Sequence, residues 1–157
     1  LRVERLARSL NVAKSGFYYH FADREDLLRH ILDYWSLEYT QVITANPRLM
    51  ERDPRERILL AMKQVFELNL SEYDAAMDLW SRRDARVARK RKQVIESRLK
   101  FFRDAFAELG FTGDDLEMRT RVCAVFQMSE RPVLGSSRKA SERYRELRLK
   151  MLLGDKG

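Results

Sequence analysis

The sequence lacks the residues and runs that build several kinds of functional site. Its 157 residues include one cysteine and two histidines. The lone cysteine, Cys123, excludes a disulfide framework and a cysteine metal cluster. His20 and His30 have no His, Cys or carboxylate neighbours at metal-ligand spacing, so we expect no metal site. No apolar stretch approaches the roughly 20 residues that a membrane span needs, and no signal peptide is visible.

Sequence motifs for catalysis are also missing. There is no glycine-rich phosphate loop and no nucleophile elbow. An enzyme would have to depend on scattered carboxylates, which any chain with 35% charged residues supplies. We therefore expect no catalytic residues and no cofactor, in a soluble, cytoplasmic protein. A length of 157 residues with 45% hydrophobic content is enough for a substantial core.

Residues 3–21 have the spacing of a helix, a tight turn and a second helix. The first helix places apolar side chains on one face and charged ones on the other. The apolar face comprises Val3, Leu6, Ala7 and Leu10. Asn11 tolerates the left-handed conformation that ends a helix, and Val12 is expected to fill the corner. This is the spacing of a helix-turn-helix motif.

The second helix, residues 14–20, has an unusual surface. Gly16 costs a helix roughly 1 kcal/mol relative to alanine, which indicates a close-packed partner surface. Five other side chains can donate hydrogen bonds to phosphates and base edges: Lys14, Ser15, Tyr18, Tyr19 and His20. The alternative is an ordinary solvated helix with two amphipathic tyrosines. The preceding turn favours DNA recognition.

The run VAKSGFYYHF at residues 12–21, followed by DREDLL at 23–28, resembles the signature of the TetR family of bacterial transcriptional regulators. The resemblance implies an all-α protein with three parts. These are an N-terminal helix-turn-helix DNA-binding domain, a long connecting helix, and a helical bundle that binds a small effector and dimerises. Such a protein would bind double-stranded DNA at a near-palindromic operator.

Carried over by position, the resemblance divides the DNA-binding residues into two groups. Lys14, Ser15, Gly16 and Tyr18 would face bases, whereas Arg2, Tyr19, His20 and Arg24 would face the phosphate backbone. Two positions depart from the commoner family pattern. Ala13 replaces a capping Ser or Thr, and Ser15 replaces Gly, which leaves the operator preference open.

The resemblance also predicts the domain limits. Residues 1–22 would be a DNA-binding domain truncated at its N-terminus, because a family member has another helix before this point. Residues 23–157 would form the effector-binding and dimerisation domain.

Net charge is +7, but the basic residues concentrate outside the helix-turn-helix. The strongest block runs from Arg82 to Arg103. It could attract DNA or an anionic ligand over long range. A solvated helix surface is the simpler interpretation, and we favour it.

Helix boundaries can be placed along the rest of the chain. A long connecting helix should begin at the capping residue Asp23 and end at Asn46-Pro47. Asp53-Pro54 is a typical helix start, Ser71 with Asp74 predicts another, and Asp114-Asp115 a further one. A long helix from about 84 to 109 should close at Gly110.

Methionine and aromatic residues on the inner helix faces suit an adaptable apolar pocket. A plain bundle core explains any one of them equally well, so the ligand is implied by the resemblance more than by the residues. The expected ligand-binding residues are Trp35, Tyr39, Met62, Phe66, Asn69, Trp80, Leu99 and Phe102.

The last two helices are the candidates for dimerisation. In the family the equivalent pair packs against its copy as a four-helix bundle, which places two DNA-binding domains about one helical turn apart, roughly 34 Å. The expected interface residues are Val122, Val125, Met128, Tyr144, Leu147 and Met151. The alternative is that these helices close a monomeric core.

The favoured hypothesis is a repressor whose operator binding is released by a small, mostly apolar effector. An activator would have the same residues, so repression is only the family default. The alternative is a helical interaction module of the same fold that has no ligand sensing.

Overall fold

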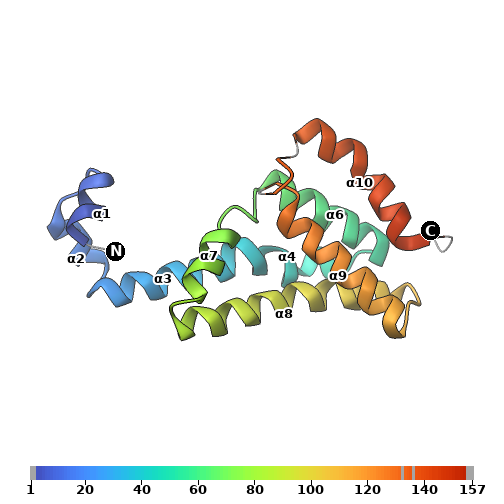
Figure 1. Ribbon diagram of the computed structural model, residues 1–157, viewed down its shortest axis with the longest axis horizontal. Coiled ribbons are helices and arrows are strands. Elements are labelled where there is room, and N and C mark those ends of the chain that lie inside the picture. The colour runs from blue at the N-terminus through green and yellow to red at the C-terminus, as the bar shows by residue number, and fades with distance from the viewer. Residues whose placement is uncertain (1–2, 132, 136, 155–157) are drawn as a thin grey trace. The chain divides into compact units, whose positions relative to one another are not determined.

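The computed structural model describes residues 3–131, 133–135 and 137–154 (Figure 1). Within these ranges every regular element is a helix and no strand occurs, which confirms the all-α class. No helix in this part of the chain combines the length and the apolar character needed to cross a membrane. Arg2, which the sequence assigns to the phosphate backbone, lies outside the described residues.

The chain divides into two compact units, Leu1–Trp35 and Ser36–Gly157. The family resemblance predicts an earlier domain boundary, after residue 22. The first unit extends further because Leu27 and Ile31 pack with Val3 and Phe17 in one hydrophobic cluster. Most of the connecting helix therefore belongs to the same compact unit as the helix-turn-helix.

The first unit contains α1 (Val3–Ser9), α2 (Lys14–His20) and α3 (Arg24–Ser36). Asn11 has φ 53°, as predicted for the residue that ends the first helix. The Val12 N–H donates to the Ala7 carbonyl (2.9 Å) and the Asn11 N–H to the Arg8 carbonyl (3.2 Å). These two bonds form a Schellman motif, which satisfies carbonyls that a helix end leaves without partners.

Two details of this corner differ from the sequence analysis. The sequence pattern predicts Leu10 on the buried face of the first helix and Val12 in the corner between the helices. Their exposed fractions are 63% and 50%. Within the first unit, the Schellman turn directs both side chains away from the cluster of Val3, Phe17 and Leu27.

The start of α3 carries a pair of reciprocal caps. Asp23 Oδ1 accepts from the Asp26 N–H (2.7 Å), and Asp26 Oδ2 accepts from the Ala22 N–H (2.9 Å). The bond from Ala22 is the main reason that the pKa of Asp26 lies below its usual value. The two aspartates fix the beginning of α3 directly after the helix-turn-helix.

The connecting helix is continuous, as the sequence predicts, but it is not uniform. α3 leads into a π-helical turn, η1 (Leu37–Gln41), and then into α4 (Val42–Thr44). A short α5 (Pro47–Met50) follows, and Asn46 caps it by accepting from the Arg48 N–H (3.1 Å). π-helical turns within α-helices are rare and occur frequently at functional sites.

The second unit is completed by five longer helices. They are α6 (Pro54–Glu67), α7 (Asp74–Ser81), α8 (Ala85–Glu108), α9 (Gly113–Ser129) and α10 (Arg138–Leu153). In this unit α8 packs against α7, α6 and α9, and α10 packs against α6 (Figure 1). The buried core includes Ile58, Met62, Phe106 and Leu153, and the thiol of Cys123 is buried among them.

Side-chain caps set several of these boundaries. The carboxylates of Asp53 and Asp84 accept from N–H groups at the starts of α6 and α8, both at 2.9 Å. Gly110 has φ 85° after α8, as predicted. Ser71, however, does not begin α7: the N-cap position is Tyr73, and Ser71 is buried.

Candidate nucleic-acid interface and buried pocket

The outer face of α2 is formed almost entirely of exposed polar and aromatic side chains. Lys14, Ser15, Tyr18, Tyr19 and His20 are all exposed, and Tyr19 is exposed by 85%. The Tyr19 and His20 rings contact each other edge to face, 5.0 Å between centroids. The structure thus brings the predicted donors together on one short helix.

A small hydrophobic cluster holds α2 in place. Phe17 is the buried residue of this helix, and its ring lies 5.4 Å from that of Phe21. It packs with Val3 of α1 and Leu27 of α3, and Leu6 and Ile31 complete the cluster. One inward phenylalanine therefore leaves the rest of α2 free to face a partner.

Lys14 is paired in the isolated chain. Its ammonium lies 2.9 Å from the Glu4 carboxylate, and both side chains are more than half exposed. Hydrogen bonding to Glu4 is the main cause that raises the pKa of Lys14. Exposed pairs of this kind contribute little to stability, so a phosphate or a base edge can displace Glu4.

The structure bears on two positions that the sequence singled out, Ala13 just before α2 and Gly16 within it. Ala13 occupies the N-cap position with extended backbone and supplies no side-chain bond to the helix start. A Cβ added at Gly16 would meet no atom of the described residues within 4 Å. Packing within the chain therefore does not require glycine at this position.

Arg24, the remaining DNA-contact candidate, is exposed at the beginning of α3 and pairs with Glu25 (2.5 Å). In the sequence, Arg24 follows the end of α2 closely. With Arg2 outside the described residues, seven of the eight predicted DNA-contact residues belong to α2 or to the first residue of α3.

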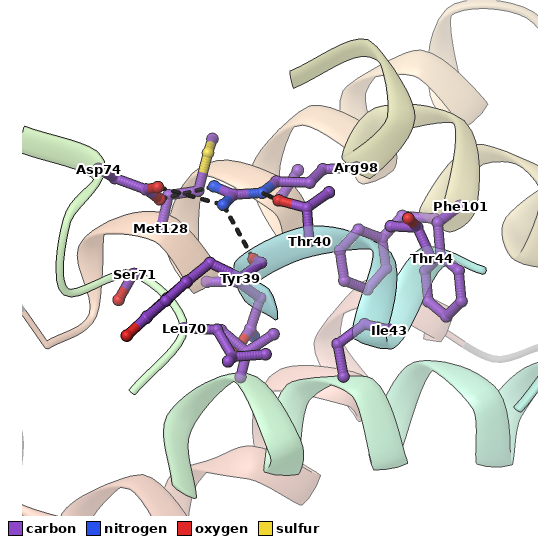
Figure 2. A pocket seen from close by; sticks show the side chains of 14 residues that line it. Tyr39, Thr40, Ile43, Thr44, Leu70, Ser71, Asp74, Arg98, Phe101 and Met128 are labelled. Atoms are coloured by element: carbon purple, nitrogen blue, oxygen red, sulfur yellow. Dashed lines mark hydrogen bonds and ion pairs between the residues drawn. The ribbon is translucent and has the colours of Figure 1, made fainter. Parts of the chain in front are cut away.

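The second unit contains a buried pocket (Figure 2). Its walls come from η1, α4, α6, α7, α8, α9 and the segment between α6 and α7. The lining residues are Tyr39, Thr40, Ile43, Thr44, Val65, Leu70, Ser71, Asp74, Arg98, Phe101, Phe102, Ala124, Gln127 and Met128. Its volume is about 30 Å³, comparable to one water molecule.

An arginine and an aspartate are the charged groups of this lining. Arg98 of α8 and Asp74 of α7 form a bidentate pair, with distances of 2.6 and 3.1 Å. Arg98 Nε also donates to Thr40 Oγ1 (3.0 Å) and Nη2 to the Tyr39 carbonyl (3.1 Å). One guanidinium therefore connects α7 and α8 to the π-helical turn η1, as Figure 2 shows.

One polar group of the lining is not satisfied. Gln127 is exposed by only 5%, and among the described atoms its Nε2 has no hydrogen-bond partner. A buried amide N–H without an acceptor is costly in a folded protein. The pocket thus contains a donor that a bound acceptor could satisfy.

The predicted ligand residues are only partly gathered at this pocket. Tyr39 and Phe102 line it. Met62 is in the hydrophobic core, Leu99 packs against that core, and Phe66 is buried outside the lining. Trp35 belongs to the first unit, and Trp80 is half-buried away from the lining.

Asn69 is placed differently from the expectation that it projects from an inner helix face. It has φ 53° at the end of α6, where its N–H donates to the Phe66 carbonyl (3.2 Å). The Leu70 N–H donates to the Val65 carbonyl (3.0 Å), which completes a second Schellman motif. Asn69 therefore ends a helix and does not line the pocket.

Five of the six predicted dimer residues form two exposed apolar stripes. Val122 and Val125 are exposed on α9 by 47% and 54%, and Met118 extends this stripe. Tyr144, Leu147 and Met151 are exposed on α10. The sixth, Met128, is half-buried and lines the pocket instead.

The basic block from Arg82 to Arg103 is extensively paired with acids. Arg82 and Arg91 both pair with Asp78, and Arg103 pairs with Glu117. Hydrogen bonds from Arg86 lower the pKa of Asp84 to about 2. The interpretation as a solvated surface holds for much of the block. Arg98 is the exception, because its side chain is only 12% exposed.

Within the described ranges, no group of His, Cys, Asp and Glu is arranged to hold a metal ion. Burial raises the pKa of the Cys123 thiol to about 12, which keeps it protonated.

A compact helix-turn-helix with an exposed, donor-rich second helix defines the class of DNA-binding proteins that insert this helix into a groove. The family model described as bacterial regulatory proteins of the tetR family matches residues 1–31, which span α1, α2 and the first part of α3. The first part of the chain is therefore similar to the DNA-binding segment of tetR-family regulators, which supports a role as a DNA-binding transcriptional regulator. No curated protein and no solved structure matches it significantly.

Proposed function

We propose that the chain is a homodimeric repressor that holds a near-palindromic operator and is released from it by a small, mostly apolar effector. It would act in the cytoplasm, without a catalytic step or a cofactor. The observation that carries the DNA-binding half is the exposed donor face of α2, supported from behind by Phe17. Arginine, lysine, tyrosine and serine donors suit phosphate oxygens and the acceptor edges of bases.

The release step is supported by chain continuity. α3 begins beside the DNA-contact residues and continues without interruption into η1, whose Tyr39 and Thr40 line the pocket. A ligand that alters the contacts of η1 acts on the same helix that helps to form the cluster behind α2. Without effector, the dimer would present its two recognition helices about one helical turn apart.

A specific observation favours the alternative of an interaction module without ligand sensing. The volume of about 30 Å³ is far below the roughly 300–1,000 Å³ of typical small-molecule sites. Effector binding therefore requires a wall of the pocket to move. The alternative predicts that no small molecule changes the affinity for DNA.

The first experiment is a selection from random DNA duplexes with this protein at near-physiological salt. Enrichment of a palindrome with half-sites about one turn apart supports both the recognition helix and the dimer. The absence of any enriched sequence would overturn the repressor proposal.

Two substitutions in α2 are expected to act differently on that operator. Tyr19→Ala removes a phosphate contact, so binding to all sequences should weaken together. Lys14→Ala removes a base contact, so discrimination between operator and mutated sites should fall, by about 1–3 kcal/mol at one position. Competition binding with matched duplexes measures both quantities, and equal losses of both in the two variants would refute these roles.

A Gly16→Ala variant is expected to be more stable but to bind DNA less well. Its Cβ enters open space in the free chain, so alanine should gain about 1 kcal/mol of helix stability. The same methyl group would stand between α2 and DNA at the place of closest approach. Thermal unfolding and operator titration measure the two effects.

Ala13→Ser is the matched control for this variant. It adds the missing side-chain cap of α2 and should also contribute about 1 kcal/mol, without bulk at residue 16. If both variants bind the operator equally well, the proposal that DNA approaches α2 closely at Gly16 is wrong.

The apolar stripes of α9 and α10 carry the dimer proposal. Charges at their centres, in the double variant Val122→Glu/Leu147→Glu, are expected to give a monomer, because burying unpaired carboxylates in an apolar interface is costly. Sedimentation should show half the mass, and palindrome binding should fall to the level of a single half-site.

Leu79→Glu is the control, because Leu79 is exposed by 64% but lies on α7, away from both stripes. It should leave mass and binding unchanged. If the Val122→Glu/Leu147→Glu protein remains dimeric, the dimer interface lies elsewhere.

A further inference from the structure

The Arg98–Asp74 pair is the polar centre of a pocket that is otherwise largely apolar. Arg98 is fixed in the middle of α8, with its side chain only 12% exposed, and it donates to Asp74, Thr40 and Tyr39. Asp74 is the first residue of α7 and follows a stretch of turns at 68–73. Of the two charges, Asp74 therefore lies at a helix end beside these turns, whereas Arg98 lies in the interior of a long helix.

The lining also contains a buried donor that has no acceptor among the described atoms. The buried Gln127 Nε2 has no partner among the described atoms, and the buried Ser71 adds a hydroxyl. Around these groups lie Ile43, Leu70, Phe101 and Phe102. Such a site matches a ligand with an apolar body and an acceptor at one end.

We propose that the effector is a small apolar carboxylate whose carboxyl group takes the place of Asp74 on Arg98. The inference rests on the proposed function and names the chemical class of its ligand. The exchange keeps one carboxylate on the guanidinium, so no buried charge is left without a partner. Gln127 Nε2 supplies a further donor for the same molecule.

Other ligand classes fit these groups less well. A cation would compete with Arg98 for Asp74, would place a second positive charge beside the guanidinium, and would leave Gln127 without an acceptor. A neutral molecule could accept from Gln127, but it offers no group to replace Asp74. The displacement of Asp74 would also remove the bidentate pair that joins the start of α7 to α8 beside this pocket of about 30 Å³.

The exchange also has a route to the DNA-binding unit. The guanidinium that the ligand would take over is the one that donates to Thr40 and Tyr39 in η1. Any shift of Arg98 toward the ligand alters these bonds, and η1 continues directly from α3. Carboxylate binding should therefore lower the affinity for the operator.

The test uses the full chain and four probes: benzoate, hexanoate and the methyl ester of each acid. Thermal unfolding is followed as each probe is titrated, since a ligand of the folded state raises the midpoint, and a tighter ligand raises it more at the same concentration. The acids are expected to raise the midpoint and the esters are not.

Asp74→Asn is the decisive variant. It removes the competing carboxylate but keeps the size of the side chain, so the protein without ligand should be less stable and should bind the acids on the order of tenfold more tightly. Asp78→Asn is the matched control, because Asp78 is an aspartate of the same helix that pairs with Arg82 and Arg91 outside the pocket. It should bind the acids as the unchanged protein does.

The double variant Asp74→Asn/Arg98→Gln removes both charges and should lose the acid response. The proposal is overturned if the esters bind as well as the acids, if Asp74→Asn does not tighten acid binding, or if no acid binds either protein. Operator titrations of the same proteins separate this failure from that of the proposed function. Acid binding that leaves operator affinity unchanged refutes effector release, whereas release by a different molecule refutes only the ligand class.

Discussion

A Phe17→Ala protein is expected to lose operator binding while its second unit still unfolds at the original temperature. Phe17 is the buried residue of α2, and its cluster contains few other side chains. Removing a buried phenylalanine costs about 3–5 kcal/mol. At about 0.05–0.15 kcal/mol per residue, a unit of the size of Leu1–Trp35 has only about 2–5 kcal/mol of stability. The substitution therefore removes most or all of it.

Hydrogen exchange resolved by segment measures this separation. Amides of α1 and α2 should exchange freely, whereas those of α6 and α8 should keep their protection. Tyr19→Ala is the control, because Tyr19 is exposed by 85% and its loss should weaken DNA binding without loss of protection. If protection in α6 and α8 also falls, the two units do not unfold independently.

Glu108→Ala is expected to destabilise the second unit more than its exposure suggests. Glu108 is half exposed, but its partner Arg57 is only 3% exposed and is held in a bidentate pair, at 2.9 and 2.6 Å. Removing the carboxylate leaves a buried guanidinium without its counter-charge, at a cost of about 3–5 kcal/mol. The pair joins α6 to the end of α8, so the loss should appear in global unfolding of this unit.

Urea unfolding of two further variants tests the cause. In Arg57→Met/Glu108→Leu both charges are gone, and most of the stability should return because no buried charge remains. Glu56→Ala breaks the exposed Arg52–Glu56 pair (3.5 Å) and should change the stability by less than about 0.5 kcal/mol. A double variant as unstable as Glu108→Ala would mean that packing, and not the unpaired charge, causes the loss.

The boundaries of helices were predictable where a local signal determines them. Asn11, Asp53 and Gly110 each act within a few residues of their own position, through a left-handed conformation or a side-chain cap. The helix-turn-helix was predictable for the same reason, since its helices, turn and inward Phe17 lie in one short stretch. Asn69 adopts the same left-handed conformation as Asn11. Its role at the end of α6 is therefore also a local signal, because asparagine tolerates this conformation.

The pocket could not be read from the sequence because its walls come from distant segments. Arg98 meets Asp74 and Thr40 across 24 and 58 positions, and nothing near Arg98 distinguishes it from the other basic residues of its run. Met128 was assigned to the dimer surface because α9 is apolar on most sides, and only the position of α8 shows which side faces the pocket. The π-helical turn has no sequence signal that we can identify.

The burial of the single cysteine makes the chain a convenient background for spectroscopic labelling. Cys123 is fully buried and its thiol stays protonated, so it should not react with maleimide or methanethiosulfonate reagents. Cysteines introduced at exposed positions, such as Ser9 in the first unit and Glu51 in the second, would then be the reactive pair. Paramagnetic probes at these two sites would report the distribution of distances between the units, and its change when benzoate or operator DNA is added.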